Sequence, residues 1–155
     1  MPRITNIELM MQKEQHTITV RTRTAVQNLP QFIGESYGRL GAYLMEKGGY
    51  LSEVPFVAYH NMDMQDLDVE AGFPVATALE GRDEIKSGII PAGLIVFCIY
   101  RGPYDGIGPV YEEMAEWISK NGLIPSGSAY ECYYNGPEFP PEELLTKIVM
   151  PVHKA

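Results

Sequence analysis

Alternation of polar and apolar positions predicts several β-strands along the chain. In residues 17–26 (TITVRTRTAV), Ile18 and Val20 fall on one side, and Arg21 and Arg23 fall on the other. This period of two is typical of a half-buried strand. We expect residues 4–11 to be its antiparallel partner, with a turn over 12–16. Residues 93–100 (GLIVFCIY) are apolar on both sides and predict a buried central strand. The remaining expected strands are 55–61, 67–75, 129–135 and 144–152.

A different spacing predicts two helices. In residues 28–47 the apolar side chains Ile33, Tyr37, Leu40 and Leu44 form one stripe. In residues 109–121 the same spacing is made by Val110, Tyr111, Met114, Trp117 and Ile118. We expect a loop or a short hairpin end at 77–88 and a loop at 136–143.

Three glycines, Gly34, Gly38 and Gly41, lie inside the first predicted helix. Each costs the helix roughly 1 kcal/mol relative to alanine. They therefore predict a surface that another backbone or a ligand approaches closely.

The order strand–helix–strand–strand occurs twice, and short echoes recur at an offset of 73 to 74 residues. Residues 47–50 match 120–123, residues 59–61 match 133–135, and Tyr37 matches Tyr111. A repeat of this period indicates two related units. The sequence thus predicts an α+β fold of tandem β-α-β-β modules with antiparallel sheets and a pseudo-twofold axis. Residues 1–155 would form one domain with halves at about 1–78 and 89–155, and a ligand pocket would lie between them.

Charge narrows the range of partners. The 155 residues include 20 acidic and 12 basic side chains, a formal net charge of −8. Such a balance argues against direct binding of nucleic acid, which depends on neutralising phosphates. The sequence also predicts no signal peptide and no membrane span. With two cysteines only, Cys98 and Cys132, we expect reduced thiols and a cytoplasmic location.

Glu131 is the residue with the strongest chemical signal. It shares one face of a predicted strand with Ala129 and Tyr133. A buried carboxylate is costly unless it is paired, hydrogen-bonded or protonated. Val57 stands at the matching position of the first repeat, so the fold itself needs no acid there. The alternative is an edge-strand glutamate facing solvent.

His16, His60 and His153 lack metal-ligand spacing, so we expect no metal and no cofactor.

The chain resembles the gyrase-inhibitor-like (GyrI-like) small-molecule-binding domains, which also serve as effector-binding modules of AraC-type and MerR-type regulators. The matching segments, in order, are 90–93 (IPAG), 100–104 (YRGPY), Trp117 with 121–123 (NGL), 129–133 (AYECY) and 144–152. The resemblance implies an SHS2-type duplicated fold. No residues remain for a helix-turn-helix domain, so it implies a stand-alone binding module.

The resemblance also places Glu131 in a ligand pocket that attracts hydrophobic, cationic aromatic molecules. Aromatic walls would add stacking and cation–π contacts. The candidate wall residues are Tyr37, Tyr59, Phe97, Tyr104, Tyr111, Trp117 and Tyr133. For Trp117, a place in the core is an equal alternative.

Two other functions stay open at this point. Some members of the family hydrolyse strained electrophiles, and here Glu131 would be the acid or base, with Tyr133 or Tyr111 polarising the substrate. The family name also implies a macromolecular partner such as gyrase. We expect binding rather than catalysis, because Glu131 has no second titratable group at fixed spacing. The natural ligand and the oligomeric state are left open by the sequence.

Overall fold

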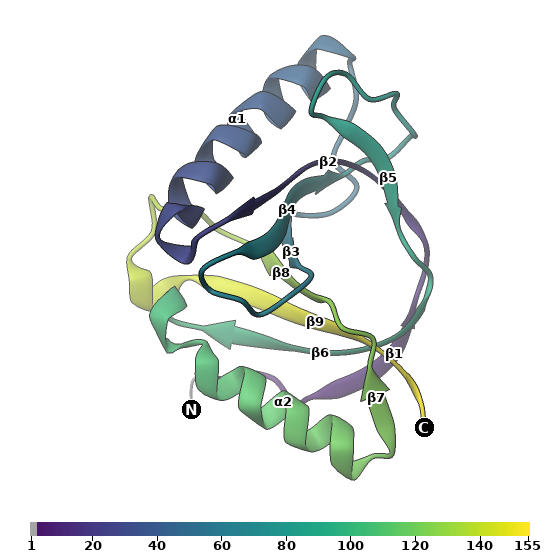
Figure 1. Cartoon of the computed structure of the whole chain (residues 1–155), viewed down its shortest axis with the longest axis vertical. Helices are drawn as coiled ribbons and strands as arrows, with labels where there is room; N and C mark the ends of the chain where they lie inside the picture. Colours follow the sequence, from purple (N-terminus) through teal and green to yellow (C-terminus); the bar gives the residue numbers. More distant parts are fainter. Residues whose placement is uncertain (1–2) are drawn as a thin grey trace. The chain divides into compact units, whose positions relative to one another are not determined.

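A computed structural model describes residues 3–155 and shows an α+β fold with antiparallel strands, as predicted (Figure 1). The chain divides into two compact units. One comprises residues 13–92. The other combines the segment ending at Gln12 with residues 93–155. Each unit contains a strand, a helix and two further strands in the predicted order, whereas the tandem duplication itself stays a prediction.

The unit of residues 13–92 packs one helix on an antiparallel sheet with strand order β3-β4-β2-β5. Leu40, Tyr43 and Leu44 of the helix are buried against the sheet residues Ile18 and Phe73. The predicted helical stripe thus contributes to the core. The elements are β2 (Gln15–Thr24), α1 (Leu29–Glu46), β3 (Phe56–Tyr59), β4 (Leu67–Pro74) and β5 (Lys86–Ile90), with a short 3₁₀ helix η1 (Val26–Asn28) before α1.

The other unit has the strand order β1-β6-β9-β8, and β7 also pairs with β9. Its elements are β1 (Glu8–Gln12), β6 (Gly93–Arg101), η2 (Tyr104–Gly106), α2 (Gly108–Lys120), β7 (Leu123–Pro125), β8 (Ala129–Tyr133), η3 (Pro141–Glu143) and β9 (Leu145–Lys154).

Helix α2 covers one face of the strands in this unit and runs alongside β6 (Figure 1). Its buried side chains Met114 and Ile118 pack against Val96, Cys98 and Ile148. Burial raises the pKa of the Cys98 thiol to about 11, so this cysteine is a core residue and a poor nucleophile.

The predicted pairing of residues 4–11 with residues 17–26 is wrong. β1 pairs with β6, with Met10 opposite Ile95. In the structure β4 pairs with one edge of β2 along residues 17–24, and β5 pairs with the other edge along residues 15–19. Strand β5 begins within residues 77–88, which were expected to form a loop or a short hairpin end, and an antiparallel bridge between Arg82 and Ile85 precedes it. The short strand β7 was not predicted.

The helix glycines do not mark a close backbone approach. Apart from the neighbouring backbone of the helix itself, a Cβ built on Gly34 or Gly38 meets no atom of the described residues within 4 Å, and on Gly41 it meets Phe73 at 3.9 Å. The tight position is Gly72 in β4. There a Cβ would lie 2.5 Å from Cζ of Phe56 and 2.7 Å from Cγ2 of Thr19.

Alanine substitution should therefore have opposite effects at two glycines. Gly72→Ala should lower the free energy of unfolding by about 1–3 kcal/mol, because the added methyl group overpacks the sheet. Gly34→Ala should raise it by roughly 0.5–1 kcal/mol, because alanine favours a helix interior. Urea denaturation measures both values. A Gly72→Ala protein as stable as wild type would contradict the packing.

Candidate functional site

The central residue of the candidate site is Glu131, which lies in the middle of β8. It is directly opposite Ile148 of β9, and Ile148 belongs to the core beneath α2. Directly opposed residues of an antiparallel pair share a face, so Glu131 projects toward α2. Its exposed fraction is 8%. The solvent-facing alternative is therefore wrong.

Two tyrosine hydroxyls hold the carboxylate. Tyr111 of α2 donates a hydrogen bond to Oε2 at 2.6 Å, and Tyr133 of β8 donates one to Oε1 at 2.9 Å. Tyr133 reaches the carboxylate because residues two apart on a strand share a face. Among the side chains of residues 3–155, no Lys, Arg or His forms an ion pair with Glu131. The negative charge is hydrogen-bonded but has no counter-ion in the described chain.

Burial raises the pKa of Glu131 above the ordinary value of 4.5. The hydrogen bonds from Tyr111 and Tyr133 favour the ionised form and lower the pKa, but they do not offset desolvation. The site thus holds a carboxylate that gains a proton more readily than an exposed glutamate does.

Tyr104 extends the aromatic surface beside the carboxylate. Its ring meets the ring of Tyr133 edge-on, with centroids 5.5 Å apart and an interplanar angle of 71°. Burial, followed by the charge of Glu131, raises the pKa of the Tyr104 hydroxyl. The side chain itself is 46% exposed, so Tyr104 borders solvent.

The turn that carries Tyr104 is fixed by a buried neighbour. The hydroxyl of Tyr100, at the end of β6, donates a hydrogen bond to the carbonyl of Pro103 at 2.6 Å. A Cβ on Gly102 would lie 2.8 Å from this hydroxyl oxygen, and a Cβ on Gly106 would lie 2.6 Å from it. The glycines of the motif at 100–106 therefore let the chain wrap around Tyr100 and present Tyr104.

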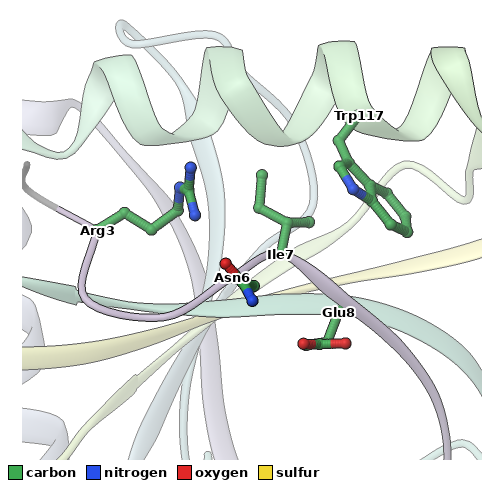
Figure 2. Close-up of a pocket in the computed structure, with 5 residues that line it drawn as sticks. All are labelled: Arg3, Asn6, Ile7, Glu8 and Trp117. Atoms are coloured by element: carbon green, nitrogen blue, oxygen red, sulfur yellow. The ribbon is translucent and has the colours of Figure 1, made fainter.

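Trp117 lies on the other flank of α2. It follows Tyr111 by six residues, about 1.7 helical turns, which places the two side chains on opposite sides of the buried stripe. Trp117 lines a shallow hollow of about 370 Å³ with Arg3, Ile7 and neighbouring residues of the N-terminal segment (Figure 2). It also packs against the core. The indole is thus not among the groups that the structure gathers around Glu131.

Phe97 lies on the opposite face of the sheet from Glu131. Its neighbours Val96 and Cys98 point into the core beneath α2, and successive side chains of a strand alternate. The ammonium nitrogen of Lys147 lies 4.9 Å from the Phe97 ring centroid, a cation–π contact.

The candidates Tyr37 and Tyr59 belong to the unit of residues 13–92. The hydroxyl of Tyr37 donates a hydrogen bond to the carbonyl of Phe56 at 2.8 Å, and its ring lies 5.4 Å from that of Phe73. Tyr59 ends β3 and is half-buried. Their participation in a site with Glu131 stays a prediction.

Thr146 of β9 was not singled out in the sequence. It lies directly opposite Tyr133 and is fully buried on the face that carries Glu131. The sequence does hold a signal for Thr146. It is a polar residue on the buried face of a strand whose other residues on that face, such as Ile148 and Val152, are apolar.

In the part of the chain that the structure describes, no group of His, Cys, Asp or Glu could hold a metal ion. No helix in that part has the length and apolar character needed to cross a membrane.

The chain belongs to the family of GyrI-like small-molecule-binding domains, because the family model matches residues 5–153. The resemblance seen in the sequence is thereby confirmed. A comparison with curated proteins gave no match.

Solved structures with the same fold include regulator domains and other proteins. The crystal structure of the EcmrR C-terminal domain has a TM-score of 0.85 at 24% identity, covering 98% of this chain and 99% of that one. In an EcmrR–DNA complex, with a TM-score of 0.84 and 24% identity, the match covers 97% of this chain and 58% of that one. A hydrolase from Listeria innocua has a TM-score of 0.72 at 14% identity, and the match covers 96% of this chain and 92% of that one. SAV2435 bound to tetraphenylphosphonium has a TM-score of 0.68 at 11% identity, and the match covers 96% of this chain and 94% of that one.

The raised pKa of Glu131 predicts a characteristic dependence of stability on pH. The unfolded glutamate loses its proton near its ordinary pKa, whereas the folded one keeps it to higher pH. The folded state therefore binds more protons between the two pKa values, and the wild type should lose stability as pH rises through that window. Relative to Glu131→Gln, the free energy of unfolding of wild type should fall across this window by about 1.4 kcal/mol for each unit by which the pKa is raised.

Denaturant unfolding of both proteins at a series of pH values measures this difference. Subtracting the Glu131→Gln curve removes the contribution of every other titrating group. A difference that stays constant across acidic and neutral pH would show that Glu131 titrates normally.

Proposed function

We propose that this protein binds hydrophobic, cationic aromatic small molecules, with the positive charge of the ligand paired to Glu131. The observation that carries the proposal is a buried carboxylate held by Tyr111 and Tyr133 with no cationic side chain paired to it. Removing one partner of a desolvated ion pair is strongly unfavourable. A site with only the acidic half therefore favours a ligand that supplies the basic half.

The aromatic rings beside Glu131 suit such a ligand. Tyr104 and Tyr133 offer faces and edges next to the charge, where a flat cation gains stacking and cation–π attraction. The net charge of −8 attracts cations at longer range. Because Glu131 is covered, the proposal requires Tyr133 to move aside when a ligand enters.

Proteins of the same fold support this ligand class by analogy. SAV2435 was solved with tetraphenylphosphonium, a hydrophobic cation. The match to EcmrR is confined to its C-terminal domain, which agrees with a binding module that other proteins join to DNA-binding parts. Fold similarity at this identity supports the class of ligand only as analogy.

Titration of a fluorescent cationic dye against wild type and Glu131→Gln tests the proposal. The dye should bind wild type, and the substitution should weaken binding at least about five-fold, because a desolvated ion pair is worth more than the ~1 kcal/mol of an exposed pair. Affinity of wild type should fall as pH drops through the raised pKa of Glu131, since protonation removes the charge. Glu131→Gln should show no such pH dependence.

Glu116→Gln is the matched control. Glu116 is exposed on α2, and its substitution changes the net charge by the same amount. It should leave dye affinity within about two-fold of wild type, because an exposed charge is screened by salt. Equal affinity of wild type and Glu131→Gln, or no binding by either, would contradict the proposal.

Hydrolysis of strained electrophiles is the second candidate. It is favoured by the proximity of a proton-accepting carboxylate and the Tyr111 hydroxyl, 2.6 Å apart, and by the hydrolase of the same fold from Listeria innocua. Glu131 would remove a proton from water as the water attacks a carbon of a three-membered ring. The carbon–heteroatom bond would break, and a tyrosine hydroxyl would protonate the leaving atom.

A neutral epoxide distinguishes the two functions. As an enzyme, wild type would consume it catalytically, and Glu131→Gln would bind it unchanged but lose about 10²–10⁴-fold in turnover. The binding function predicts no consumption above the buffer rate while cationic dyes bind. We favour binding, because among residues 3–155 only tyrosine hydroxyls contact the carboxylate of Glu131, and no second carboxylate, histidine or lysine pairs with it.

A further inference from the structure

One buried polar group on the face of the sheet that carries Glu131 has no hydrogen-bond partner among residues 3–155. Thr146 is 0% exposed, and its hydroxyl oxygen Oγ1 makes no hydrogen bond to any of the residues 3–155. It is the one buried side-chain nitrogen or oxygen atom in the described chain with this property. Buried hydroxyls are normally hydrogen-bonded, so an orphaned one calls for an explanation.

The strand register places this hydroxyl in the site. Thr146 is directly opposite Tyr133 on β8 and directly opposite Tyr100 on β6. Glu131 is opposite Ile148, two residues further along β9. All these side chains share the face beneath α2. Diagonal neighbours of this kind are about 7–8 Å apart at Cα, so one ammonium-sized group can contact both side chains.

A threonine at this position is hard to explain by packing alone. A valine has the same shape and would bury no polar atom. The apolar residues along the same face of β9, Ile148 and Val152, show that the surroundings accept aliphatic side chains. The hydroxyl therefore points to a hydrogen-bond partner that comes from outside the chain.

The chemistry of the neighbouring groups indicates what that partner carries. The carboxylate of Glu131 accepts from Tyr111 and Tyr133, which occupy two of its about four acceptor positions. The hydroxyl of Thr146 can accept as well. Most of the hydrogen-bonding positions that remain open on these two side chains are therefore acceptors. Such a pair suits a ligand with several N–H donors.

We propose that Thr146 is a second ligand-binding residue, and that the site takes protonated amines with free N–H groups in preference to quaternary onium ions. This rests on the proposed function. The ammonium group replaces the Tyr133 hydroxyl at Oε1 of Glu131 and donates a second hydrogen bond to Oγ1 of Thr146. A quaternary ammonium is attracted by the same charge but has no N–H to donate.

The experiment compares two cations that share one aromatic group: naphthylmethylammonium and its N,N,N-trimethyl counterpart. Each is titrated calorimetrically against wild type, Thr146→Val, Thr146→Ser and Glu131→Gln at a pH where Glu131 is ionised. Thr146→Val should weaken the primary amine about ten-fold and leave the trimethyl compound within about two-fold. Thr146→Ser keeps the hydroxyl and should retain most of the affinity for the amine.

Thermal unfolding without ligand supplies an independent readout. Because Thr146→Val removes an unsatisfied buried hydroxyl, its Tm should equal that of wild type or exceed it by up to about 2–4 °C. Higher stability together with weaker amine binding is the signature of a group retained for a ligand. A clearly lowered Tm would show that the hydroxyl is satisfied within the free protein, and would overturn the proposal.

The binding data separate this proposal from the proposed function. If Glu131→Gln weakens both cations while Thr146→Val changes neither, or weakens both equally, the role of Thr146 is wrong and cation binding stands. If wild type binds neither cation, or Glu131→Gln binds both as tightly as wild type does, cation binding itself fails and the role of Thr146 fails with it.

Discussion

The structure around the site depends on one constraint: a carboxylate is held away from water without a cationic side chain. Glu131 is tolerated because Tyr111 and Tyr133 each donate a hydrogen bond to one of its oxygens. These bonds stabilise the ionised form, yet burial still raises its pKa. An incoming positive charge stabilises the ionised form of this carboxylate. This is the physical basis of the proposed binding of cations.

Packing of α2 on its sheet makes this arrangement possible. The buried stripe that includes Met114 and Ile118 fixes the rotation of the helix, and Tyr111 on one flank then points to β8. Trp117 on the other flank lines a hollow together with the N-terminal segment instead. Tyr100 fixes the turn before the helix and so positions Tyr104. The same helix therefore carries core, site and surface side chains on three distinct sides.

The sequence predicted the parts of this account that rest on local periodicity. Alternation along 129–133 put Glu131 and Tyr133 on one face, and helical spacing put Tyr111 beside the core. It could not predict what depends on long-range register. The pairing of β1 with β6 and the position of Thr146 opposite Tyr133 are set by which strands meet. The same holds for Phe97, whose face is fixed by its neighbours in the sheet.

The most direct test of the account is the pKa of Glu131, measured from its side-chain carboxyl ¹³C resonance, assigned by its absence in Glu131→Gln. In the free protein we expect a pKa above the ordinary value of 4.5. With a saturating hydrophobic cation we expect a lower pKa, because the cation binds the ionised form and linkage requires the shift. An ordinary pKa in the free protein, or one that the cation leaves unchanged, would contradict the account.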